Sequence, residues 1–207
     1  MVNGEKTENI NLLGSYEDQI FTLDRVPAGR GFHWEKNISI QVVGSLDISN
    51  NNGYLFVINQ INLESYLMCV ATSEMSGNCP PALLEAQTIA ARSWLVAAVE
   101  QKHLDLDLDA CNDDCCQRYQ GIKNITTKSK QASKKTFGQF LIYDDQICDT
   151  RYSKSCGGIS ENNENVWDEP PKPYLKADFD GPSESIPDLR NNQELQTWIK
   201  DPPGCYC

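Results

Sequence analysis

A single glutamate, Glu74, stands where two helical patterns meet in the segment ATSEMSGNCPPALLEAQTIAAR (71–92). The C-terminal end of a helix carries partial negative charge, and partial burial disfavours a charged carboxylate. Both effects are expected to raise the pKa of Glu74. A carboxyl group that keeps its proton near neutral pH is what general acid catalysis needs. The alternative interpretation is an exposed residue at the end of a helix, with no chemical role.

An obvious second carboxylate for Glu74 is missing. Glycoside hydrolysis usually employs two carboxyl groups roughly 5–10 Å apart. Glu64 precedes Glu74 on the same predicted helix, at about 15 Å along the axis, which is too far for a pair. Glu85, Asp149 and Glu161 could approach only through the fold. The sequence therefore offers one acid without an evident mate.

Cysteines form the second group of reactive residues. Nine cysteines are more than a reducing cytosol favours, so export or metal binding is expected. Cys111, Cys115 and Cys116, joined by Cys148 or Cys156, could supply thiolates to a tetrahedral zinc ion. A disulfide is the alternative, for example Cys111–Cys116 or Cys148–Cys156, and free thiols are the third. No cofactor is required for catalysis by a glutamate, so a zinc ion would be structural.

Nucleophilic catalysis by cysteine or serine has weaker support. A cysteine nucleophile needs a histidine partner. The two histidines, His33 and His103, lie in an irregular segment and at the end of a predicted helix. The serine-hydrolase pattern G-x-S-x-G is absent from the sequence.

Length and charge restrict the class of protein. The 207 residues suit one domain of generous size, 40% hydrophobic and 23% charged. A net charge of −11 argues against nucleic-acid binding, because phosphate contacts require a basic surface. The sequence lacks an apolar run of the ~18 residues that a membrane span needs. The first ten residues do not resemble a signal peptide, so a cytosolic protein or a mature or trimmed chain is expected.

Segregated helices and hairpins predict an α+β fold. We expect a buried central helix pair packed against antiparallel β-hairpins, with Glu74 at a helix end in a groove. Arg92 is a polar exception on the apolar second helix, so it needs a carboxylate or substrate partner unless it lies at a solvent-facing edge. We expect helices at 62–75, 81–103, 124–136 and 192–200, and Asn62 is the expected N-cap of the first. Strands 39–49 and 54–60 should form a hairpin, and two more strands are expected within 139–158. The rest is an irregular start at 1–36 and a cysteine loop at 104–121.

Four stretches, in order, resemble one protein family. They are INLESYLMCVATSEM (61–75), PPALLEAQTIAARSW (80–94), ACNDDCCQRYQG (110–121) and RYSKSCGGISENNENVW (151–167). Together they are similar to the domain of stage II sporulation protein D, also called the amidase-enhancer domain. Three departures stand out: Ser76 replaces a proline, and Cys115 and Ile159 each replace a histidine. The change at Cys115 alters any metal site.

The resemblance implies a lytic transglycosylase that cuts peptidoglycan glycan strands outside the cytoplasm. Such enzymes cleave the bond between N-acetylmuramic acid and N-acetylglucosamine, and one acid suffices because the C6 hydroxyl of the sugar replaces water. The product is a 1,6-anhydro sugar. The family's acid falls on Glu74. The substrate-binding positions fall on Arg92, Tyr152, Lys154, Ser155, Gly157 and Gly158, and some members carry zinc at the Cys/His block.

The same resemblance allows a function of another class. A non-catalytic wall-binding protein that stimulates an N-acetylmuramoyl-L-alanine amidase would share the glycan groove but leave Glu74 without chemistry. The expected organisation is an N-terminal extension at 1–37, the catalytic domain at 38–180 and a C-terminal segment at 181–207. The family pattern predicts that the chain continues beyond Cys207.

Overall fold

A computed structural model describes residues 9–12, 19–51, 53–100, 102–182, 187–201 and 204–206. It divides into two compact units, residues 1–149 and 150–207. The expected domain boundaries near residues 37 and 180 stay predictions. Among the described residues, no helix combines the length and apolar character that crossing a bilayer requires.

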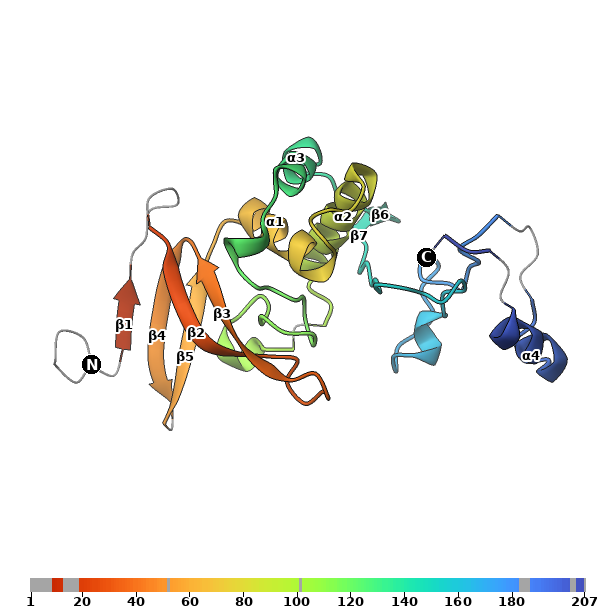
Figure 1. Ribbon diagram of the computed structural model, residues 1–207, viewed down its shortest axis with the longest axis horizontal. Helices are drawn as coiled ribbons and strands as arrows, with labels where there is room; N and C mark the ends of the chain where they lie inside the picture. The colour runs from red at the N-terminus through yellow and green to blue at the C-terminus, as the bar shows by residue number, and fades with distance from the viewer. Residues whose placement is uncertain are drawn as a thin grey trace. The chain divides into compact units, whose positions relative to one another are not determined.

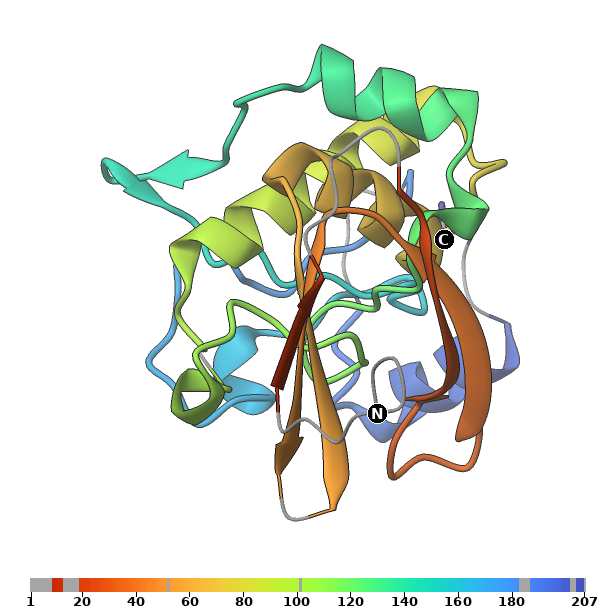
Figure 2. The same ribbon diagram turned by 90° about the vertical axis from the view of Figure 1, so that its left-hand side faces the viewer.

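In the described residues, the first unit contains three small antiparallel sheets, three α-helices and two short 3₁₀ helices. Figures 1 and 2 show how the sheets and α-helices are arranged. The sheets pair β1 with β4 and β5, β2 with β3, and β6 with β7. The strands are β1 (Asn9–Leu12), β2 (Phe21–Ala28), β3 (Lys36–Val42), β4 (Ser45–Asn51), β5 (Tyr54–Gln60), β6 (Ile142–Tyr143) and β7 (Gln146–Ile147). The helices are α1 (Leu63–Glu74), α2 (Pro81–Ala97) and α3 (Thr127–Lys135). The mixed α+β class is confirmed.

The first predicted strand of the hairpin is divided in two. The expected strand 39–49 breaks at Gly44 into β3 and β4, and only β4 pairs with β5. Gly44 has a φ of +92°, and a Cβ there would lie 2.1 Å from the carbonyl oxygen of Gln60. Only glycine fits this turn, so the chain changes sheets there. The prediction of an irregular start was wrong as well, because β1 and β2 form within it.

Helix α1 begins as the sequence predicts. The Asn62 side chain accepts a hydrogen bond of 2.9 Å from the Glu64 N–H, which caps the first turn. Leu67, Val70 and Ala71 are fully buried on its inner face. Ala71 packs with Leu84 of α2 and Ala132 of α3, so the core of the helical layer lies where the three helices meet.

Helix α2 is shorter and less enclosed than predicted. It ends at Ala97 rather than near residue 103, with Ala98 in a left-handed conformation. Leu84 is fully buried, whereas Ile89 and Leu95 are half-buried and Val96 is exposed. The apolar circumference predicted burial on all sides, but only α1 and α3 cover this helix extensively within the first unit. The predicted burial of α2 is therefore confirmed for only one face of the helix.

A buried ion pair connects the three helices. The Arg92 guanidinium has no exposed surface and donates from Nε and Nη2 to the two carboxylate oxygens of Glu64, at 2.9 and 2.7 Å. Its Nη1 donates to the Gln139 carbonyl, and Ser133 of α3 donates to Glu64. Burial alone would raise the pKa of Glu64, but the hydrogen bonds from Arg92 and Ser133 outweigh it and lower that pKa. The expected carboxylate partner of Arg92 is therefore observed.

The second unit has little regular structure. It contains a 3₁₀ turn at Asn163–Asn165 and helix α4 (Asn192–Lys200), whose bounds agree with the prediction. The Asn191 side chain caps α4 by accepting from the N–H groups of Gln193 and Glu194. An isolated antiparallel bridge joins Ile159 to Phe179.

Breaking the Arg92–Glu64 pair should strongly destabilise the first unit. Arg92→Met keeps much of the volume but leaves a buried carboxylate unpaired, at a cost of about 3–5 kcal/mol in unfolding free energy. Urea unfolding monitored by circular dichroism measures the loss. The double variant Arg92→Met/Glu64→Gln should recover part of it. Lys135→Ala, which breaks the exposed pair with Glu85, is the control and should cost at most ~1 kcal/mol. Equal losses in both single variants would contradict the assignment.

Candidate functional site

Glu74 is the last residue of α1 and is half-buried. The helix ends there because Met75 is extended and Ser76, Gly77 and Pro80 follow. The backbone N–H of Arg118 donates a hydrogen bond of 2.7 Å to Glu74 Oε1. A contact from a distant loop thus fixes the carboxyl group at the corner between α1 and α2.

The loop segment that reaches Glu74 is itself held against α1 and α2. Gln117 is almost completely buried, accepts from the Tyr66 hydroxyl at 3.0 Å and donates to the Ala91 carbonyl at 3.1 Å. Immediately before Glu74, the Ser73 hydroxyl accepts from the N–H of Gln120 at 3.1 Å. Buried polar groups need partners. These contacts fix the segment 117–120 along the C-terminal half of α1.

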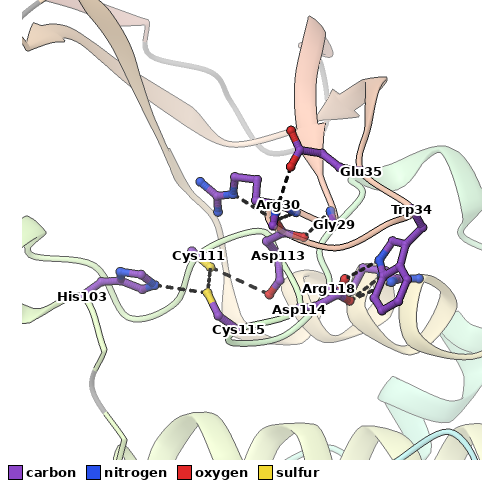
Figure 3. A network of polar contacts seen from close by, with 11 residues as sticks. Gly29, Arg30, Trp34, Glu35, His103, Cys111, Asp113, Asp114, Cys115 and Arg118 are labelled. Carbon is purple, nitrogen blue, oxygen red and sulfur yellow. Dashed lines mark hydrogen bonds and ion pairs between the residues drawn. The ribbon is translucent and has the colours of Figure 1, made fainter.

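Asp113 fixes the other end of this segment to the β2–β3 turn (Figure 3). Its carboxylate accepts from the N–H groups of Gly29 and Arg30 at 2.7 and 2.9 Å, and from Arg30 Nε at 2.9 Å. Burial alone would raise the pKa of Asp113, but these hydrogen bonds outweigh it and lower the pKa to about 2. Asp113 is therefore a buried charged anchor that joins residues 84 positions apart in sequence.

Asp114 makes the neighbouring link. It accepts from Nε and Nη2 of Arg118 at 3.0 and 2.7 Å through one carboxylate oxygen, and from Trp34 Nε1 at 3.3 Å through the other. The residue whose backbone holds Glu74 is thus connected through its side chain to the β2–β3 turn (Figure 3). Asp113, Asp114 and Trp34 could not be predicted as site residues, because no local sequence pattern indicates that 29–35 and 111–118 meet.

Cys111, Cys115 and Cys116 converge with His103. One ligand atom from each of the four lies within 4.8 Å of the others. The Sγ atoms of Cys111 and Cys115 are 3.1 Å apart, and Cys115 Sγ is 3.7 Å from His103 Nε2. The predicted proximity of Cys111 and Cys116 is confirmed. The expected disulfides are not observed, because the eight cysteines of the described residues are free thiols.

This donor set fits a tetrahedral zinc ion. With Zn–S near 2.3 Å, two thiolates of such a site lie about 3.8 Å apart, and a thiolate and an imidazole nitrogen lie about 3.5 Å apart. The Cys115–His103 distance is close to this spacing, and the Cys111–Cys115 distance is shorter. A hydrogen bond from Cys116 already lowers the pKa of Cys111 to about 4, and the same bond raises the pKa of Cys116. Zinc would take all three as thiolates. The sequence analysis missed His103 as a ligand because it is separated from the cysteines and only the fold returns it to them.

Arg92 lies in the first unit, and its side chain is fully buried. Its guanidinium is satisfied by Glu64 and the Gln139 carbonyl. The observed contacts support a structural role in the helical layer. Its assignment to the wall of a cleft stays a prediction.

The remaining predicted substrate-binding residues belong to the second unit. Lys154, Ser155 and Gly157 are exposed, Tyr152 is half-buried and Gly158 is buried. Gly158 has a φ of +93°, and a Cβ there would lie 2.9 Å from the Trp198 ring, so this glycine is needed for packing. Their assignment to substrate stays a prediction.

Comparison with known proteins identifies a family. Residues 51–143 match the family model described as stage II sporulation protein. An uncharacterized protein of Brachyspira hyodysenteriae is 30% identical over 62% of this chain and 35% of its own length. Stage II sporulation protein D of Bacillus subtilis is 29% identical, and that of Bacillus amyloliquefaciens is 26% identical, each over 58% of this chain and 39% of its own length. The chain spans somewhat more than a third of the length of these relatives.

The resemblance to the stage II sporulation protein D family is thereby confirmed. The match covers residues 51–143, a little under half of the chain. The matched residues include Glu74, Arg92 and the Cys/His cluster, whereas Tyr152 and residues 154–158 lie beyond them.

Asp113→Asn should destabilise the protein in a pH-dependent manner. The folded-state pKa near 2 lies below the ordinary 3.8, so the carboxylate contributes stability above about pH 4 and loses it as pH falls toward 2. The shift corresponds to roughly 2 kcal/mol of unfolding free energy at pH 7. Urea midpoints of parent and variant should therefore differ at pH 7 and converge between pH 4 and pH 2. Asp105→Asn, at an exposed position of the same loop, is the control. A constant difference across that range would contradict the role of the charge.

Proposed function

We propose that this protein is a lytic transglycosylase that cleaves peptidoglycan glycan strands between N-acetylmuramic acid and N-acetylglucosamine. The observation that carries the proposal is the position of Glu74: half-buried, at the end of α1, within the matched family segment, and fixed by the Arg118 N–H. These features suit a general acid, which needs access to the ligand and limited access to water. The strands, with stem peptides removed, are the expected substrate.

In the proposed reaction, Glu74 donates its proton to the glycosidic oxygen as the bond from that oxygen to C1 of the muramic acid breaks. The C6 hydroxyl of the same sugar then forms a bond to C1, and its proton passes to the Glu74 carboxylate. The products are a 1,6-anhydro end and a free hydroxyl on the leaving sugar. Glu74 regains its proton, so neither water nor a second carboxylate is consumed.

The bond at Oε1 is compatible with this role. A backbone N–H can donate to the carbonyl oxygen of a protonated carboxyl group as well as to a carboxylate. Because the acid must be protonated, the rate should fall as pH rises through its pKa.

The proposal extends to the cellular location of the protein, its substrate contacts and its partner. Substrate in the cell wall requires an extracytoplasmic location. Tyr152, Lys154, Ser155, Gly157 and Gly158 are proposed to contact the glycan by the family resemblance. A cell-wall amidase that removes stem peptides is the proposed partner, since it would supply the denuded substrate.

Glu74→Gln should separate binding from cleavage. The amide keeps the shape of the side chain but cannot donate the proton, so the rate should fall by about 10²–10⁴-fold while glycan binding is retained. Denuded glycan strands are incubated with parent and variant, and anhydro ends are quantified by mass spectrometry. Glu85→Gln, a glutamate of α2 paired with Lys135, is the control and should cleave like the parent.

Two outcomes would contradict the enzymatic proposal. Cleavage by Glu74→Gln at the parent's rate would show that Glu74 is structural. A parent that releases no anhydro ends but accelerates an amidase would establish the wall-binding alternative.

We also propose that His103, Cys111, Cys115 and Cys116 hold one structural zinc ion. Four protein ligands would close the coordination sphere, and the ion would fix the cysteine loop that carries Asp113, Asp114 and Arg118. Metal analysis should give one zinc per chain in the parent and a loss in Cys111→Ser. Cys79→Ser, outside the cluster, should retain zinc. Metal-free protein with a mass lowered by 2 Da per oxidised pair would favour the disulfide alternative.

A further inference from the structure

The turn between β2 and β3 presents a rigid aromatic surface. Phe32 and Trp34 stack with ring centroids 4.4 Å apart and planes within 5°. His33 packs against Trp34 edge-on at 4.7 Å. Phe32 is 48% and Trp34 45% exposed, so about half of each large ring meets water. Exposed aromatic surface that is held in order is a typical feature of ligand-binding sites.

This aromatic surface, Phe32 with Trp34, is anchored by contacts that do not depend on a ligand. Trp34 Nε1 donates to Asp114, the Gly31 N–H donates to Glu35 at 2.8 Å, and the Gly29 N–H donates to Asp113. Gly29 has a φ of +71°, and a Cβ there would lie 2.4 Å from Trp34 Cδ1. The edge of the indole therefore packs on a glycine where no other residue fits. Because the turn is already ordered, a ligand would bind without a large loss of conformational entropy.

The aromatic surface belongs to the same polar network as Glu74. Trp34 donates to Asp114, Asp114 accepts from the Arg118 side chain, and the Arg118 backbone donates to Glu74. Only two residues, Asp114 and Arg118, therefore separate the indole from the proposed acid along this series of contacts. Figure 3 shows both of them beside Trp34. Each of the three contacts is at most 3.3 Å long. A ligand long enough to span several sugar rings could contact both.

We propose that Phe32 and Trp34 form a glycan subsite that binds a sugar ring of the same strand that Glu74 cleaves. The C–H face of a pyranose ring is flat and apolar, and its hydroxyl and acetamide groups point outward at the rim. Stacking that face on the aromatic surface removes apolar area of both from water. The half-exposed Arg30 and exposed Glu35 lie beside it and offer polar partners for the rim. This subsite rests on the proposed function, because its ligand is the proposed substrate.

A protein partner fits the same surface less well. Protein interfaces that persist bury about 800 Å² on each side, whereas two half-exposed rings within a polar turn offer far less apolar area. A single sugar ring matches the size of the surface and its polar surroundings. The glycan strand is therefore the occupant to which the proposal commits.

Binding of denuded glycan strands by variants tests the subsite. Phe32→Ala removes one ring, and because a phenyl group makes no conventional hydrogen bond, the turn should stay folded, which thermal melting checks. Trp34→Ala removes the other ring. Each change, made in the Glu74→Gln background to prevent cleavage, should raise Kd by about tenfold, the loss expected for one stacked ring. Tyr54→Ala, at a 76% exposed aromatic of the β4–β5 hairpin, is the control and should bind normally.

Kinetics with Glu74 present distinguish the subsite from the enzymatic proposal. Phe32→Ala should raise KM with little change in kcat, because the ring binds substrate and transition state alike. If the parent cleaves glycan and both aromatic variants bind and cleave like it, the subsite is wrong and the enzyme stands. If Phe32→Ala loses glycan binding while the parent yields no anhydro ends, the subsite stands without the enzyme. Variants that keep glycan binding but no longer stimulate an amidase would overturn the glycan as occupant.

Discussion

The polar groups of segment 113–120 form hydrogen bonds with three separate parts of the fold. The geometry of the candidate site depends on these bonds. Asp113 takes the N–H groups of the β2–β3 turn, Gln117 bonds to α1 and α2, and the Arg118 N–H bonds to Glu74. Unpaired buried polar groups would cost more than these hydrogen bonds return, so each contact constrains the others. The position of the carboxyl group at the end of α1 follows from that constraint.

The carboxylates of the first unit differ in what surrounds them. Glu64 of α1 and Arg92 of α2 form an ion pair. Asp113 forms an ion pair with Arg30 and accepts hydrogen bonds from backbone N–H groups. Ion pairs of this kind hold their carboxylates in the charged form, which suits anchoring and opposes proton donation. Glu74 lies at a helix end and accepts a hydrogen bond from the backbone N–H of Arg118. The proposed role of Glu74 as a proton donor therefore concerns a different environment from that of the two anchoring carboxylates.

The Cys/His cluster and the aromatic β2–β3 turn both contact the loop that contains residues 111–118. The thiols of Cys111, Cys115 and Cys116 meet the His103 ring at one end of the segment, and the β2–β3 turn is bonded to Asp113 and Asp114 immediately beside them. Where the family pattern has a histidine, this chain has Cys115, and its thiol still lies within the cluster. A change of ligand type at that position therefore preserves the convergence of four donors.

The sequence by itself determined the elements whose signals are local. Asn62 caps α1, the prolines begin α2, and the bounds of α4 follow from a short periodic pattern, because capping and periodicity act within a few residues. Motif order alone also gave the family. The tertiary structure decided the rest: the break at Gly44, the exposed side of α2, the pairing of Arg92 with Glu64, the arrival of His103 at the cysteines, and the bonding of Trp34 to Asp114. These features join residues up to 80 positions apart, and such contacts depend on which buried group finds which partner, a choice that no local pattern encodes.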